Sequence, residues 1–147
     1  MERVQVPQLP PARTYIEAIF LYFVNGIVTG QLRYPEAVKE LSFIVEEEIE
    51  AERLRYPIIY EKFIKYLEQL FVREFGREVP DLPNLREGNP RTVLTEYLRS
   101  RSHLIVKRIA RGRRPTESEI DREIDFIVSR MIVYAGKALF KELGYLR

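Results

Sequence analysis

Prolines and glycines divide this chain into apolar, periodic segments, and that division limits most strongly what it can fold into. A proline stands at the start of four segments: Pro11, Pro35, Pro57 and Pro90. A glycine stands near the end of four segments: Gly30, Gly76, Gly112 and Gly144. Proline is favoured in the first turn of a helix and glycine just past its last turn. The pattern therefore predicts an all-α chain.

Apolar residues that recur every three or four positions predict five helices. The segments are approximately Arg13–Thr29, Glu36–Leu54, Pro57–Phe75, Asn89–Gly112 and Glu117–Leu143. We expect a left-handed Gly76, a cap at Asn89 and a capping box from Thr116 to Glu119. The stripe from Ile120 to Ala138 predicts packing against another long helix.

No segment predicts a convincing strand, an internal repeat or a second core. The expected fold is thus a single-domain bundle of about five helices over residues 1–147. We expect residues 1–12 to be an extended N-terminal segment. Residues 77–89 are expected to be a proline-rich linker between helices.

Composition narrows the classes of protein to which the chain can belong. Hydrophobic residues make up 46% and charged residues 31%, which is typical of a soluble globular domain. The absence of cysteine excludes disulfides, Cys-ligated zinc and iron–sulfur clusters. The apolar run Tyr15–Val28 is shorter than the roughly 20 residues of a membrane span. We therefore expect a cytoplasmic protein that contacts no membrane and binds no cofactor. The many Glu, Arg and Tyr residues indicate a thermophilic source.

No pattern in the chain is typical of an active site. The one histidine, His103, directly follows Ser102, and neighbours on a helix point about 100° apart. The glutamates at positions 46–52 fan out around their helix, so they do not predict a cation site. We predict no enzymatic activity, no metal and no small-molecule substrate.

Positive charge is sorted along the chain. Residues 86–114 contain nine Lys or Arg and two Glu, a net charge of +7, whereas the whole chain carries +2. One interpretation is a basic helix face at residues 91–114 that contacts nucleic acid or an acidic partner. Its predicted binding residues are Arg99, Lys107, Arg108, Arg111, Arg113 and Arg114. The alternative is internal pairing with residues 36–52, which carry −6, and with Asp121, Glu123 and Asp125.

The order of elements resembles the helical domain of GINS subunits of the replicative helicase. An acidic helix at Val38–Ile49 leads to Tyr56-Pro57 and to a helix that contains Tyr66–Leu70. A basic helix with Tyr97–Ile109 and a last helix follow the proline-rich linker. The resemblance implies an archaeal, non-enzymatic scaffold whose subunits pair through their helical domains, with Tyr97–Ile109 in the inter-subunit core. GINS subunits usually add a small β domain, and they lack a counterpart of the helix at Arg13–Thr29.

The function that we expect is a non-enzymatic helical scaffold or interaction module associated with DNA replication or maintenance. Its expected partners are other protein subunits, as a homo- or hetero-oligomer, together with DNA or RNA at the basic face. The alternative is a stand-alone protein that binds single-stranded nucleic acid through exposed Tyr and Arg side chains.

Overall fold

A computed structural model describes residues 11–146, which form six α-helices and no strand. The helices are α1 (Pro11–Val28), α2 (Tyr34–Arg55), α3 (Pro57–Phe75), α4 (Pro90–Ser100), α5 (His103–Ile109) and α6 (Glu117–Glu142). The predicted all-α, single-domain fold is confirmed. Of the extended segment predicted at residues 1–12, residues 1–10 lie outside the described residues. Its last two residues belong to α1, which begins at Pro11.

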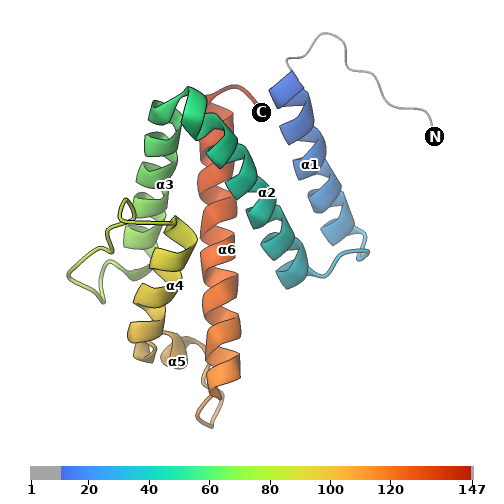
Figure 1. The fold of residues 1–147 in the computed structure, drawn as a ribbon. Helices are drawn as coiled ribbons and strands as arrows, with labels where there is room; N and C mark the ends of the chain where they lie inside the picture. The colour runs from blue at the N-terminus through green and yellow to red at the C-terminus, as the bar shows by residue number, and fades with distance from the viewer. Residues whose placement is uncertain (1–10, 147) are drawn as a thin grey trace.

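Helix α6 is the central element, and the other helices are arranged around it (Figure 1). Helix α3 packs beside the C-terminal part of α6 and α2 crosses α6, whereas α4 and α5 pack against its N-terminal half and α1 lies on the outer side of α2. Leu67, Leu98, Ile124 and Leu139 are fully buried and come from α3, α4 and α6. The predicted apolar stripe of the last helix therefore forms the middle of the core.

Most of the expected helix ends are present. The Asn89 side chain accepts a hydrogen bond from the Thr92 N–H at 3.2 Å, and Thr116 and Glu119 form the expected capping box. The prediction for Gly76 is wrong, because its φ is −60°. The backbone continues to turn there, since Glu78 and Val79 both donate to the Phe75 carbonyl.

The helix expected over Asn89–Gly112 is interrupted, which gives six helices rather than five. Helix α4 ends at Ser100, and Arg101 leaves helical geometry with φ −123° and ψ 45°. The Ser100 hydroxyl donates to the Tyr97 carbonyl at 2.8 Å, a local bond that competes with the helical pattern. The second piece, α5, buries Leu104 and Ile105 against the bundle.

Arg91, in the first turn of α4, joins three helices. Its guanidinium donates to Glu46 of α2 at 2.9 Å and to the hydroxyl of Ser129 of α6 at 3.0 Å, and it also donates to Ser42 of α2. Ser42 and Ser129 are both buried, and both contact this one side chain. Arg91 also lies 4.4 Å from the centre of the Phe43 ring. The Arg91 side chain is only 16% exposed, so water contributes little to its solvation.

We expect Arg91→Ala to destabilise the fold by about 2–4 kcal/mol, because it leaves the half-buried Glu46 and two buried hydroxyls without their donor. Arg99→Ala, on the same helix, is the matched control. The Arg99–Asp121 pair is more than half exposed, and such pairs contribute about 1 kcal/mol or less. Urea unfolding of both variants measures the difference, and equal losses would refute the special role of Arg91.

Helices α2 and α6 approach each other closely at Gly136. A Cβ atom added at this position would lie inside van der Waals contact of Val45 Cγ1. Val45 is β-branched and buried, so it has little freedom to move aside.

We therefore expect Gly136→Ala to destabilise the protein by about 1–2 kcal/mol, although alanine gains about 1 kcal/mol in helix propensity. Because Val45→Ala relieves this overlap, it should lower the free energy of unfolding less in the Gly136→Ala background than in the original chain. A double-mutant cycle from urea unfolding measures this coupling. A Gly136→Ala variant more stable than the original chain would contradict the close approach.

Candidate nucleic-acid interface

Four of the six predicted binding residues are paired with acidic side chains of the same chain. The partners are Asp121 for Arg99 at 3.3 Å, Glu78 for Lys107 at 2.5 Å, Glu74 for Arg108 at 2.9 Å and Glu119 for Arg113 at 3.0 Å. The acidic partners come from α3, from the linker that follows it and from α6. The expected basic face is therefore largely neutralised within the fold.

Lys107 and Arg108 hold α5 against the end of α3. Arg108 also donates to the Glu74 carbonyl at 3.0 Å, and its guanidinium lies 4.4 Å from the centre of the Phe75 ring. The hydrogen bond from Lys107 lowers the pKa of Glu78. These contacts direct both cations toward the bundle, whereas Arg99 points to the first turns of α6.

Arg113 takes part in the start of α6. Its guanidinium contacts both carboxylate oxygens of Glu119, at 3.0 and 3.1 Å. Glu119 also accepts the backbone N–H of Thr116 at 3.0 Å as half of the capping box. The Arg113 hydrogen bond, followed by the contacts with Thr116, lowers the pKa of Glu119 to about 2.

Arg111 and Arg114 differ from the other four residues. Both are exposed in the turn between α5 and α6, and neither makes an ion pair with another residue that the structure describes. The turn contains Gly112 in a left-handed conformation, with φ +79°. Of the six predicted residues, these two present unneutralised charge.

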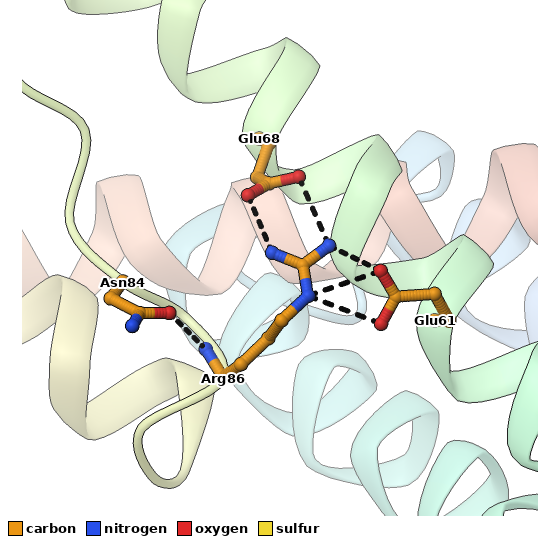
Figure 2. A network of polar contacts seen from close by, with 4 residues as sticks. All are labelled: Glu61, Glu68, Asn84 and Arg86. Atoms are coloured by element: carbon orange, nitrogen blue, oxygen red, sulfur yellow. Dashed lines mark hydrogen bonds and ion pairs between the residues drawn. The ribbon is translucent and has the colours of Figure 1, made fainter.

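The remaining cations of the basic segment also have internal roles. Figure 2 shows Arg86 between Glu61 and Glu68 of α3, with its backbone N–H donating to Asn84 at 3.1 Å. The two glutamates raise the pKa of Arg86 and fix the linker to α3. Arg101 lies 3.8 Å from the centre of the Tyr97 ring, so it stacks on an aromatic side chain.

The acidic helix α2 pairs only partly with the basic segment. Glu46 binds Arg91, whereas Glu50 pairs with Arg53 of its own helix at 3.5 Å. Burial, followed by repulsion from Glu52 and Glu47, raises the pKa of Glu48. Among residues 11–146, no group of three or more His, Cys, Asp or Glu side chains is placed to hold a metal ion.

The structure contains a recess of about 1040 Å³ between α2, α3 and the start of α4. Its walls carry both carboxylates and guanidiniums, including Glu46, Glu50, Arg53 and Arg91. These four groups form two internal pairs, so their charges are already compensated.

A smaller groove of about 410 Å³ lies between α3 and α6 and was not indicated by the sequence. We call it the α3–α6 groove, and its lining residues are Tyr66, Gln69, Leu70, Arg73, Tyr134, Lys137, Ala138 and Lys141. Three of these residues are basic and none is acidic. The four-residue spacing of Lys137 and Lys141 was a visible signal, but the contribution of Arg73 from α3 requires the fold.

Comparison with protein-family models, with curated proteins and with solved structures finds no match. Among the described helices, none has both the length and the hydropathy to cross a membrane. The fold and the side-chain geometry therefore carry the functional argument.

The lowered pKa of Glu119 predicts a pH-dependent contribution to stability. The ionised carboxylate stabilises the native state above the ordinary glutamate pKa, and this contribution is lost as the pH falls toward about 2. Glu119→Gln should thus lower the melting temperature at pH 7, and the difference from the original chain should shrink as the pH falls from 5 to 2. Thermal unfolding followed by circular dichroism measures both trends. Glu117→Gln is the control, because Glu117 lies in the same turn but outside the capping box; an equal effect at pH 7 would argue against this assignment.

Proposed function

We propose that this chain is a non-enzymatic helical scaffold that assembles with further protein subunits. The first partner is a second copy of the chain, bound through the outer side of α1. The observation that carries the proposal is the apolar outer surface of α1, which is exposed in the described part of the chain.

Helix α1 is apolar on both its inner and outer sides. Ile16 and Phe23 are buried against the bundle, and Phe20 makes an edge-to-face contact with Phe140 of α6. The outer side carries five exposed large apolar residues: Tyr15, Leu21, Tyr22, Val24 and Val28. A helix that is hydrophobic all round is normally covered on all sides.

The outer side of α1 suits self-association. Between residues 15 and 28, Glu17 is the single charged residue, so two copies can approach with little repulsion between like charges. Leu21 and Tyr22, which are 60% and 63% exposed, lie at the middle of this span. A two-fold axis at this point makes α1 helices antiparallel and places Tyr15 of one copy near Val28 of the other.

The association with DNA replication or maintenance is a further part of the proposal. Its support is the sequence resemblance to GINS helical domains, which pair into larger assemblies. Exposed cations are a second source of support, because a scaffold at nucleic acid benefits from long-range attraction to phosphates.

We expect the purified chain to be a dimer and Val24→Glu to convert it to a monomer, since each interface would bury two added carboxylates. Sedimentation equilibrium over a concentration series measures the mass. Val72→Glu on α3 is the matched control, because Val72 is 49% exposed and Val24 52%. A chain that is monomeric at every concentration, or a dimer that is equally sensitive at Val72, would refute pairing through α1.

A further inference from the structure

We propose that the α3–α6 groove binds the backbone of single-stranded nucleic acid. This site is separate from the basic residues of the 86–114 segment and lies on different helices from the proposed α1 interface. The proposal rests on unneutralised cations, on the absence of lining carboxylates and on an exposed aromatic ring.

The groove gathers cations whose charge is not used within the fold. Arg73, Lys137 and Lys141 are exposed, and none of them forms an ion pair with another residue in the described part of the chain. By contrast, Arg99, Lys107, Arg108 and Arg113 each have an acidic partner. Cations without partners keep their full attraction for phosphate.

Glu74 and Glu142, which neighbour Arg73 and Lys141 in the sequence, are already engaged. Glu142 accepts hydrogen bonds from Lys62 and from the Tyr66 hydroxyl, the latter at 2.6 Å. Glu74, near the other end, accepts from Arg130 at 3.0 Å and from Arg108. These two carboxylates therefore have partners other than the three groove cations.

The arrangement of the cations follows two helices. Lys137 and Lys141 are one helical turn apart on α6, a rise of about 6 Å, and Arg73 faces them from α3. Positive charge on both walls can neutralise successive phosphates of one strand that lies along the groove.

Tyr134 adds a surface on which a base can stack. It is 46% exposed beside the cations, and Leu70 and Ala138 form an apolar part of the same lining. An exposed aromatic ring in a groove lined by cations favours single-stranded nucleic acid over an acidic peptide, whose carboxylates offer no ring to stack.

The test is fluorescence anisotropy of a labelled oligothymidylate with the full chain at several salt concentrations. Three phosphate contacts predict a slope of about −2 for log affinity against log salt. The double charge reversal Lys137→Glu and Lys141→Glu should weaken binding at least tenfold. Tyr134→Leu should weaken it about tenfold without changing the salt slope, since stacking is not ionic.

Arg111→Glu with Arg114→Glu is the matched control, because it also reverses two exposed cations without internal partners. It should change affinity much less than the groove variant. Loss of binding in this control with an unaffected groove variant would overturn the proposal, as would the absence of binding by the original chain at low salt. Equal competition by oligoglutamate would assign the groove to acidic protein segments and would also overturn it. Circular dichroism verifies that each variant folds, and the oligomeric state is measured separately, so failure of α1 pairing remains distinguishable.

Discussion

The position of α4 in the fold depends on its Arg91 guanidinium, which satisfies polar groups that α2 and α6 bring into the core. Ser42 of α2 and Ser129 of α6 are completely buried, and each contacts Arg91. Within the described residues, no buried side-chain nitrogen or oxygen lacks a hydrogen-bond partner. Because an unpaired buried hydroxyl is costly, α4 has one favourable position against α2 and α6. Arg86 fixes the preceding linker to α3, so the start of α4 is held from two directions.

The same positioning explains why a strongly basic segment becomes a largely neutral surface. Once α4 is anchored, α5 lies beside the end of α3, where Glu74 and Glu78 meet Arg108 and Lys107. Positive charge that is concentrated in one segment of the sequence is therefore not concentrated on one surface of the folded chain. Of that segment, Arg111 and Arg114 stay exposed and unneutralised, and further unneutralised cations come from α3 and α6, where Arg73, Lys137 and Lys141 line the α3–α6 groove. A surface that attracts phosphate is defined by which cations lack partners, more than by how many occur in one segment.

Helix number and type were largely predictable because proline, glycine and apolar spacing act locally. The caps at Asn89 and Thr116 and the long stripe of α6 follow from residues within one or two turns. The break at Arg101 was not predictable, because it lets Leu104 and Ile105 reach a core formed by distant helices. Gly76 likewise keeps a right-handed conformation because the backbone continues to turn after it, and this turn brings Val79 into the core. The α3–α6 groove was only partly signalled by the spacing of Lys137 and Lys141, since Arg73 lies more than sixty positions before Lys137 and is brought beside them by the fold.

Helix α1 differs from the other helices in how it contributes to the fold. The core formed by α2, α3, α4 and α6 is organised around α6, whereas α1 contacts mainly α2 and reaches α6 through Phe20 and Phe140. The turn after α1 is nevertheless well defined, because Gly30 is left-handed and Gly26 lies directly against Leu32. A helix held in a defined position, with only its inner side covered by the described helices, presents its outer residues in a fixed arrangement. Such preorganisation lowers the entropy cost of association, so α1 is better suited to assembly than to completing the core.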